Sequence, residues 1–457
     1  METAYDVVVV GARCAGSPLA TQLARAGLSV AVVDRAEFPS DTASTHIFQV
    51  EGVASLSRLG VLDTVLATGA PWLERVDVRV ESFRAHATVP LRPGDAGPGL
   101  CVRRRVLDAI LVDAARAAGA DVRTATRVVG LLGGEGDRVR GVRVVTGGRE
   151  EDLLAALVVG ADGAGSTVAR LVGARRYNVV PNQRFGTWRY YQGARWESPA
   201  TLVFHRWAGE LVIACPADGG LYLVIVIPPL ARLGAFRSDV AAGWAAAVAG
   251  CEPVADAIAG ARAAGRDRTM STYPAFFRES AGPGWVLVGD AGHVTDPTPG
   301  QGISDALRQV DRLAPAVVAG LGGQHPLDRA LADWWRWRDA DAAEMHWFAA
   351  DLGAAASSPA VVVELMQRLT AARGGTARLV DVLNHRMAPS GVMTPRRLVG
   401  AGAGLMLDRR QPVRAVAADM WALVGQDLRR RRLNRHPDWE PAQPPLRTGE
   451  RGKVSLP

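Results

Sequence analysis

The sequence predicts an α/β fold in which a doubly wound lobe of the nucleotide-binding type is interleaved with a β-sheet lobe and followed by a helical region. Three observations support this prediction. Apolar, strand-like runs lead into glycine-rich turns at three places far apart in the chain, the middle of the chain holds further β-branched runs, and the C-terminal part is rich in alanine with helical spacing. A chain of 457 residues is long enough to bury a sizeable core in two or three lobes.

The first glycine-rich turn lies between Tyr5 and Asp34. Tyr5–Val10 is an apolar, β-branched run, which is typical of a strand buried on both faces. Helical spacing follows up to Gly27, and a second strand-like run ends at Asp34, so the turn belongs to a βαβ unit. Asp34 follows Gly11 at about the distance, roughly 20 residues, at which an acidic residue binds the ribose hydroxyls of an adenosine. This segment predicts a dinucleotide site, the alternative being a βαβ unit without a nucleotide.

The turn departs from the pattern G-x-G-x-x-G, because Arg13 stands where the middle glycine is expected. Gly11 allows a tight turn and Gly16 a close approach of helix and strand, while the helix N-terminus attracts a pyrophosphate. We expect the Arg13 guanidinium to extend along the pyrophosphate and pair with it; the alternative is an arginine that points to solvent. The expected contacts are Gly11, Ala12, Arg13, Cys14, Ala15, Gly16, Asp34 and Arg35.

Two further strand-to-turn segments lie downstream. Leu157–Gly160 leads into the dipeptide Asp162-Gly163. Trp285–Val288 leads into GDAGHVTDPTPGQG, after which the apolar spacing becomes helical from Ile303. Each turn therefore sits at the end of an apolar strand, the edge of an α/β sheet where ligands bind.

In this order the three motifs resemble those of the FAD-dependent monooxygenases of the p-hydroxybenzoate hydroxylase type, the group A flavoproteins. The stretches GARCAGSP and PSDTASTH further resemble a bacterial subgroup of FAD-dependent oxidoreductases. The resemblance covers about residues 5–340. It implies a Rossmann-like FAD-binding lobe of the GR2 type, an interleaved substrate sheet, and FAD as the cofactor.

Asp290 ends its strand at the ligand-binding edge, so we expect its carboxylate to accept hydrogen bonds from the ribityl hydroxyls of the flavin; the alternative is a helix cap. Gly300 and Gly302 would let the backbone approach the ring. The helix from Ile303 would direct its N-terminus at the pyrimidine end, where reduced flavin is anionic. The flavin contacts expected here are Gly289, Asp290, Gly300, Gln301, Gly302 and Ile303.

The resemblance implies three more cofactor contacts. Arg104 begins a match to the pattern R-x-x-L-D, whose arginine touches the phosphate or ribityl region; the alternative is a solvated basic start to a helix over 106–118. Val128 matches the segment whose backbone meets the adenine. Asp162 belongs to the DG motif, which by resemblance serves both FAD and NAD(P)H, and it is expected to act mainly through structural hydrogen bonds.

The organisation follows from the motifs and the inserts between them. The FAD-binding domain is expected to use residues 1–75, 98–175 and 274–335, and the substrate domain residues 76–97 and 176–273. A helical region is expected over 336–425, and the proline- and arginine-rich residues 426–457 read as a flexible tail. Only one turn of the nucleotide type both follows a strand and opens a helix, so NAD(P)H is expected as a transient reductant without a domain of its own.

Composition excludes several classes of protein. The formal charge of +7 comes from scattered arginines, with Lys453 as the single lysine, so no nucleic-acid binding is expected. No apolar run approaches about 18 residues, so no stable membrane insertion is expected. The four cysteines are far apart and the histidines lack metal-ligand spacing, which argues against a metal site and for the cytoplasm. A monomer or a homodimer is expected.

The expected reaction is a hydroxylation or epoxidation of an aromatic or polyketide-like small molecule. NAD(P)H would reduce the flavin, the reduced flavin would react with O₂ to give a C4a-hydroperoxide, and this species would transfer one oxygen atom to the substrate. His46 follows PSDT in a loop that, by resemblance, passes the flavin ring; histidine titrates near neutrality, so His46 could move a proton, or it could be structural. The substrate is expected between the flavin and the sheet lobe. Candidate contacts are Arg189, Tyr190, Tyr191, Phe204, His205 and Phe277.

Three rival functions remain. A flavin halogenase would need an active-site lysine, but the sole lysine is Lys453, and the motif W-x-W-x-I-P is missing. A C=C reductase of the prenyl reductase type shares the FAD lobe, although Tyr222–Pro228 reads YLVIVIP and not Y-x-W-x-F-P. A flavin-binding protein without redox turnover is the third alternative.

Overall fold

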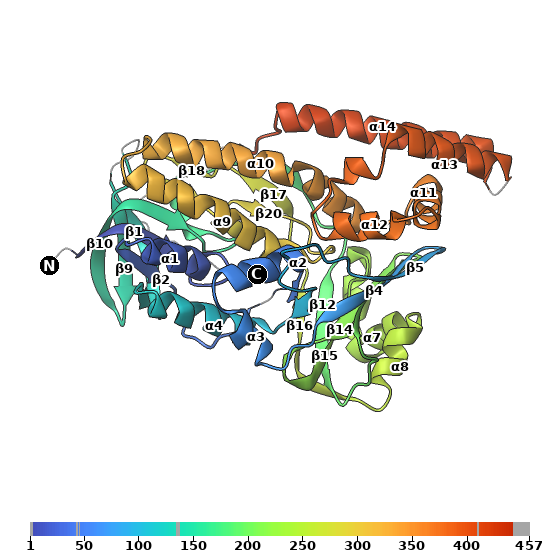
Figure 1. Cartoon of the computed structure of the whole chain (residues 1–457), viewed down its shortest axis with the longest axis horizontal. Helices are drawn as coiled ribbons and strands as arrows, with labels where there is room; N and C mark the ends of the chain where they lie inside the picture. The colour runs from blue at the N-terminus through green and yellow to red at the C-terminus, as the bar shows by residue number, and fades with distance from the viewer. Residues whose placement is uncertain (1–2, 43, 45, 134–137, 409–410, 442–457) are drawn as a thin grey trace.

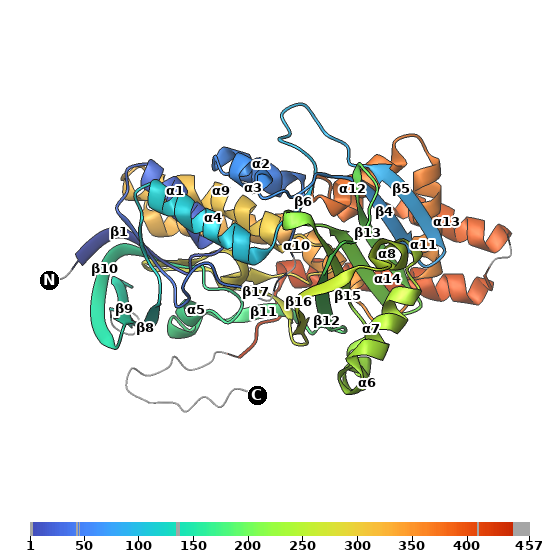
Figure 2. The same cartoon turned by 90° about the horizontal axis from the view of Figure 1, so that it is seen from below.

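The computed structural model describes residues 3–42, 44, 46–133, 138–408 and 411–441, and it confirms the α/β fold. Two large sheets lie next to each other along the molecule (Figure 1, Figure 2). The helices of residues 360–371, 375–383 and 395–407 lie at the end opposite the N-terminus, and that of residues 413–435 runs back from there towards the middle (Figure 1). Within the described residues, no helix is both long and apolar enough to cross a membrane.

The first large sheet has eight strands within the described residues. They are β18 (Ala281–Gly282), β19 (Trp285–Leu287), β10 (Arg149–Gly160), β1 (Thr3–Val10), β2 (Val30–Val33) and β7 (Asp121–Arg123), in that order, with β8 (Thr126–Leu132) pairing with β9 (Gly141–Thr146) and β9 with β10. β10 is parallel to both β1 and β19, which puts the carboxyl ends of all three motif strands on the same side of the sheet.

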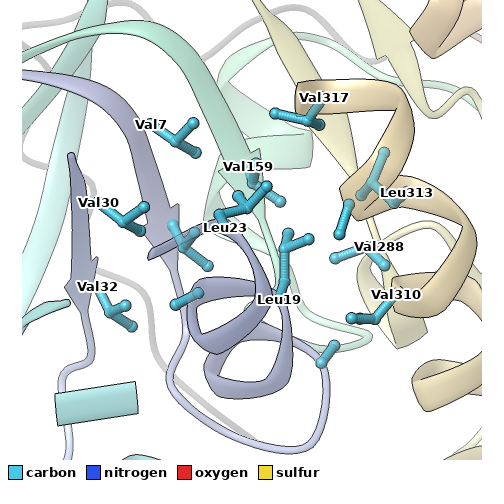
Figure 3. Close-up of a cluster of buried hydrophobic side chains, with 14 of the residues drawn as sticks. Val7, Leu19, Leu23, Val30, Val32, Val159, Val288, Val310, Leu313 and Val317 are labelled. Carbon is cyan, nitrogen blue, oxygen red and sulfur yellow. The ribbon is translucent and has the colours of Figure 1, made fainter. Parts of the chain in front are cut away.

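Helices cover the sheet and explain why β1 is a run of valines. The covering helices are α1 (Gly16–Arg25), α4 (Arg104–Ala117), α9 (Gly302–Leu321) and α10 (Leu327–Leu352), with the short α5 (Thr167–Leu171) on the other face. Val7 and Val9 enter the core beneath α1 and α9, whereas Val8 and Val10 enter the core of the opposite face. Figure 3 shows the first of these cores, in which Leu19 of α1 packs among side chains of β1, β2 and α9. Both faces are apolar because both are covered.

The second large sheet has seven strands among the described residues, and only β13 and β4 pair in parallel. In order they are β16 (Arg262–Met270), β12 (Gly186–Gln192), β15 (Leu221–Val226), β14 (Glu210–Pro216), β13 (Ala200–Trp207), β4 (Leu73–Val80) and β5 (Phe83–Thr88). One face packs on the first lobe, through residues such as Ile47 and Cys101. The other face is covered by α6 (Leu233–Ser238), α7 (Val240–Ala249) and α8 (Glu252–Ile258).

Smaller elements join the two lobes. β3 (Ile47–Phe48) pairs with β6 (Leu100–Cys101), and β11 (Arg176–Val180), β17 (Ala275–Arg278) and β20 (His293–Val294) form a third sheet. Near them lie α2 (Val50–Arg58), α3 (Leu62–Leu66) and the 3₁₀ turns η1 (Asp218–Gly220), η2 (Leu230–Arg232) and η3 (Gly289–Ala291).

The C-terminal region is helical, and its last helix runs further than the sequence predicts. It comprises α11 (Ala360–Ala371), α12 (Gly375–Leu383), η4 (Pro389–Gly391), α13 (Pro395–Leu407) and α14 (Val413–Arg435). The chain then returns to β11, where Trp439 lies 4.3 Å from the Tyr177 ring centroid and Glu440 pairs with Arg176 at 2.6 Å. The expected tail from 426 is therefore ordered structure up to these contacts, because aromatic and ionic partners distant in sequence hold it; residues 442–457 lie outside the described residues.

Candidate functional site

The first glycine-rich turn is so tight that only glycine fits at positions 11 and 16. Gly11 has a φ of 102°, and a Cβ added there would lie 2.4 Å from the carbonyl oxygen of Ala161. A Cβ on Gly16 would lie 1.7 Å from the carbonyl oxygen of Gly11. Helix α1 begins here with no side-chain cap at Ala15 and no acidic residue in its first turn. The Ser17 and Leu19 amides donate to the carbonyl oxygens of Arg13 at 3.1 Å and Ala15 at 3.2 Å, and Pro18 has no amide hydrogen. The amides of residues 14–16 donate to no described residue, so they are the ones left for an anion such as a pyrophosphate.

Asp34 lies at the end of β2, beside the same turn. It is buried, and its carboxylate accepts hydrogen bonds from the backbone amides of Ala12 and Ala36, both at 2.8 Å. A carboxylate offers about four lone-pair sites, so two acceptor positions remain. The contact of Asp34 with ribose hydroxyls therefore stays a prediction that this geometry permits. Arg35 next to it is exposed and makes no ion pair with any residue that the structure describes.

Arg13 does not point into solvent. Its guanidinium donates to Asp108 at 2.5 Å and to Ser40 at 2.9 Å, and it lies over the Phe38 ring at 5.3 Å. The solvated alternative is therefore wrong. The structure also adds a partner that the sequence analysis did not include, because Asp108 is 95 residues away along the chain.

Asp108 joins the two arginines of the site. It is fully buried in α4, where it also accepts hydrogen bonds from Arg104 at 3.0 and 3.2 Å and from the thiol of Cys14 at 3.4 Å. Arg104 is buried as well, so the alternative of a solvated basic helix start is wrong for this residue. The spacing of four residues between Arg104 and Asp108 is the sequence signal that could have identified Asp108.

Asp290 lies on η3, at the end of β19. Asp290 is exposed, yet desolvation by the surrounding protein raises the pKa of its carboxyl group to about 6. The positive charge of the nearby Arg104 lowers this pKa, and the negative charge of Asp305 raises it. Protein packed densely around a carboxylate that is still accessible from outside accounts for both observations. An accessible acceptor of this kind suits the hydroxyl groups of a ribityl chain.

The raised pKa of Asp290 makes a pH-dependent prediction. In the apoprotein, the folded state holds the proton of Asp290 more tightly than the unfolded state does. The resulting contribution to the free energy of unfolding is complete below pH 3.8, the ordinary pKa, and is lost as the pH rises through about 6. We expect Asp290→Asn to remove this loss and so to raise the melting temperature of the apoprotein above that pH. The same change should weaken FAD binding, because FAD hydroxyls would donate to the ionised carboxylate.

Thermal unfolding and FAD titration across the pH range measure both effects. FAD affinity of the wild type should increase as the pH rises through about 6, and that of Asp290→Asn should not. Asp333→Asn, which changes an exposed carboxylate on α10, is the matched control. Equal pH profiles for wild type and Asp290→Asn would show that Asp290 does not meet the cofactor.

The Asp162 side chain of the DG motif forms hydrogen bonds within the protein, and Val128 packs in a hydrophobic core. The Asp162 carboxylate accepts hydrogen bonds from the Ser166 hydroxyl at 2.5 Å and the Thr167 amide at 2.6 Å, the structural bonds expected of it. Val128 is buried in β8 within the core on the far face of the first sheet. Its backbone contact with adenine stays a prediction.

The turn before α9 approaches the loop that carries His46. A Cβ on Gly300 would lie 3.8 Å from Ile47, and the Gln49 side chain donates to the carbonyl oxygen of Pro299 at 2.9 Å. The side-chain amide oxygens of Gln49 and Gln301 are buried and accept no hydrogen bond from any described residue. Gly302 has no atom within 4 Å of an added Cβ, and Ile303 is buried in the core behind α9. Two acceptors and an open backbone thus lie where the flavin ring is expected.

His46 lies against the sheet lobe. Its buried ring is 5.8 Å from that of Tyr190 and 6.2 Å from that of Trp188, both on β12. The Tyr190 hydroxyl is buried without a hydrogen-bond partner among the described residues, and burial raises its pKa well above its ordinary range. The structure therefore brings together a histidine, a phenol and an indole, and Ile47, the residue after His46, connects this cluster to the turn of Gly300.

Three predicted substrate contacts lie on the opposite face of the sheet, so those predictions are corrected. Arg189 pairs with Asp267 at 2.6 Å and stacks on a tryptophan of α7, and Tyr191 is buried in the core under the same helix. His205 contacts Asp77 at 3.0 Å and the thiol of Cys251. Side chains alternate between faces along a strand, so Trp188 and Tyr190 point towards His46 while Arg189 and Tyr191 point away.

Phe277 also lies away from the site. It stacks between the rings of Tyr177 at 5.6 Å and His293 at 4.4 Å, in a cluster against α10. His293 is part of this packing, and burial lowers its pKa well below its ordinary value. Neither residue reaches the loop of His46, so Phe277 is not supported as a substrate contact.

Comparisons with known proteins relate this chain to proteins that bind FAD. Residues 4–232 match the family described as FAD binding domain, which is half of the chain. The menaquinone reductase of Mycolicibacterium smegmatis is 30% identical over 355 residues, covering 70% of this chain and 78% of the reductase.

Solved structures share the fold. The flavin-dependent brominase Bmp2 superposes with a TM-score of 0.69 at 20% identity, covering 90% of this chain and 100% of the brominase chain. The anhydrotetracycline hydroxylase OxyS from Streptomyces rimosus gives a TM-score of 0.66 at 23% identity, covering 84% of this chain and 76% of the hydroxylase chain. Such low identities relate the folds without relating the reactions.

Proposed function

Since this chain belongs to the FAD binding domain family and is an FAD-dependent oxidoreductase, we propose that it is a monooxygenase that uses NAD(P)H and O₂ to oxidise an aromatic or polyketide-like small molecule. The observation that carries the proposal is the cluster of His46, Trp188 and Tyr190 beside the turn of Gly300. Two aromatic rings with one buried hydroxyl suit a flat, mostly apolar ligand held by few polar contacts.

The residues of the nucleotide turn would hold the cofactor. The amides of α1 would bind its pyrophosphate, Asp34 its ribose and Asp290 its ribityl chain, and the open backbone at Gly302 would accept its ring. Bound FAD would supply reducing equivalents and the activation of O₂. The chain itself must orient the substrate and exclude water, which the buried face formed by Trp188 and its neighbours can do.

His46 and Tyr190 would handle the proton of a phenolic substrate. A histidine can accept a proton near neutral pH, and the substrate hydroxyl would lie within its reach if the ring packs on Trp188. Tyr190 would donate a hydrogen bond from a phenol that burial keeps protonated. Both residues come from segments that meet only in the folded protein.

A second candidate is the reduction of a C=C bond. It is favoured by the 30% identity with a menaquinone reductase over more than two thirds of both chains. The same apolar face would then hold an unsaturated chain, and the buried Tyr190 hydroxyl would be the nearby proton donor. A halogenase is not favoured, because the sole lysine is Lys453.

Oxygen consumption separates the two reactions. We expect the FAD-loaded protein to consume O₂ with NADH or NADPH faster in the presence of phenols or polyketides, and to place one atom of ¹⁸O₂ in the product found by mass spectrometry. Product formed without O₂, with two added hydrogens and no ¹⁸O, would support the reductase instead. Flavin that NAD(P)H and dithionite both leave unreduced would indicate a binding protein without redox turnover.

The variant His46→Asn tests the site within the same assay. We expect its product yield per NAD(P)H to fall by roughly 10²-fold, the lower range for losing a general base, while FAD content stays unchanged. His86→Asn, an exposed histidine on β5 far from the cluster, is the control. A wild-type yield from His46→Asn would remove His46 from the mechanism.

A further inference from the structure

The C-terminal helices enclose a second candidate site. A cavity of about 470 Å³ lies between α11, α12 and α13 and shares no lining residue with the nucleotide turn or with the loop of His46. Five arginines line it, namely Arg368, Arg373, Arg378, Arg396 and Arg397. No motif of the sequence analysis falls in this region.

The positive charge of the cavity is largely uncompensated. Glu364 pairs with Arg368 at 2.6 Å, and none of the described residues that line the cavity is acidic. Arg373, Arg378 and Arg396 are exposed and form no ion pair with any described residue. Three unpaired guanidinium groups around one hollow repel each other, and an anion would relieve that repulsion.

Two of the arginines are held in place by the fold. Arg368 lies directly against α13, where a Cβ on Gly404 would be 1.7 Å from its Nη2. The Arg397 guanidinium donates to the carbonyl oxygens of Gly391 at 2.9 Å and Val392 at 3.1 Å. Fixed guanidinium groups lose less conformational entropy when they bind a ligand than mobile ones do.

The helix ends add to the positive field. Gly375 is the first residue of α12, and Thr394 is the N-cap of the 13-residue α13; both line the cavity. The N-terminus of a helix carries a partial positive charge that favours anions. The cavity walls otherwise include the apolar side chains of Leu365 and Leu369.

We propose that this cavity binds a phosphate-bearing small molecule or headgroup, with its phosphate or diphosphate between the arginines of α11, α12 and α13. Arginine recognises phosphate oxygens through paired, charge-assisted hydrogen bonds. The volume falls within the range of small-molecule sites, about 300–1,000 Å³, so the cavity has room for the organic part of such a ligand as well as for its phosphate. The site does not depend on the reaction proposed above.

The phosphate can come from a free metabolite or from a lipid. A lipid is a real alternative, because large apolar side chains near the cavity are exposed and could contact a membrane. Val399, next to the lining residue Gly400, is 61% exposed, and Trp421 of the neighbouring α14 is 77% exposed. The chemistry at the arginines is the same in both cases. The experiment therefore needs one arm for each source.

The test uses the full chain loaded with FAD, so that the nucleotide turn is occupied. Isothermal titration with sodium pyrophosphate is the first arm, and flotation with phosphatidylcholine vesicles, with and without phosphatidic acid, is the second. We expect saturable pyrophosphate binding that the combined variant Arg373→Gln, Arg378→Gln, Arg396→Gln weakens by about tenfold or more. Flotation that requires phosphatidic acid and these arginines would identify a lipid; its absence would identify a free phosphate compound.

A charge-matched control separates the site from general basicity. The variant Arg149→Gln, Arg262→Gln, Arg329→Gln removes three exposed, unpaired arginines elsewhere in the described chain and should bind pyrophosphate as the wild type does. Three results would overturn the proposal. Both variants could weaken pyrophosphate binding equally, the cavity variant could bind pyrophosphate as tightly as the wild type does, or the wild type could bind neither pyrophosphate nor the vesicles. FAD content and circular dichroism confirm that both variants fold.

Discussion

Gly16→Ala is expected to lower the affinity for FAD by at least about tenfold, and to leave the purified protein largely without flavin. The added Cβ would lie 1.7 Å from the carbonyl oxygen of Gly11 and 3.1 Å from a methyl group of Val9. Both neighbours belong to the strand and turn that shape the nucleotide site, so neither can move without opening it. The visible absorbance of bound flavin relative to protein measures the effect.

Gly234→Ala is the control for this substitution. Gly234 lies in α6 with no atom within 4 Å of an added Cβ, and its backbone is helical, so alanine should be tolerated or slightly stabilising. If Gly16→Ala retains wild-type flavin content, the close approach of α1 and β1 is not needed for the cofactor, and the fingerprint interpretation of the turn fails.

Asp108→Ala is expected to lower the free energy of unfolding by about 3–5 kcal/mol, the cost of removing one partner from a buried ion pair. Its carboxylate is fully buried and holds both Arg13 and Arg104, so its removal leaves two guanidinium groups without their shared counter-ion. Urea denaturation with and without FAD measures the loss. FAD affinity should fall as well, because Arg13 and Arg104 would no longer be held beside the nucleotide turn.

Asp113→Ala provides a matched control on the same helix. Asp113 pairs with Arg116 at 3.1 Å, but the side chains are 73% and 46% exposed, and exposed pairs contribute no more than about 1 kcal/mol. A loss from Asp108→Ala that is as small as the loss from Asp113→Ala would mean that Asp108 is not the electrostatic centre of the site.

The cofactor half of the site was more predictable than the substrate half. Gly11, Gly16 and Asp290 follow strands within a few residues, and their roles depend on local turns and helix starts that the chain order alone specifies. The substrate contacts depend on which way each side chain of β12 points. Trp188 and Arg189 are neighbours in sequence, yet one meets His46 and the other meets α7.

Asp108 and Trp439 show a second limit of prediction from sequence. Asp108 lies in the quoted R-x-x-L-D pattern, but its pairing with Arg13 joins residues 95 positions apart. The contact of Trp439 with Tyr177 likewise joins distant segments. Because the sequence does not reveal this contact, the composition of the residues from 426 onwards predicted a flexible tail. Composition describes a segment, whereas its order depends on the partners that it meets.

By itself the sequence determined the α/β fold, the three motifs that converge on one sheet edge and the identity of the FAD family, because strand periodicity and glycine-dependent turns are local properties of the chain. The tertiary structure decided which face of the second sheet meets His46 and that one buried carboxylate serves two arginines. It also decided that four arginines of three helices, with Arg373 of the loop between α11 and α12, surround one cavity. These features arise from the packing of separate elements, whose register and orientation are set by burial over the whole molecule rather than by neighbouring residues.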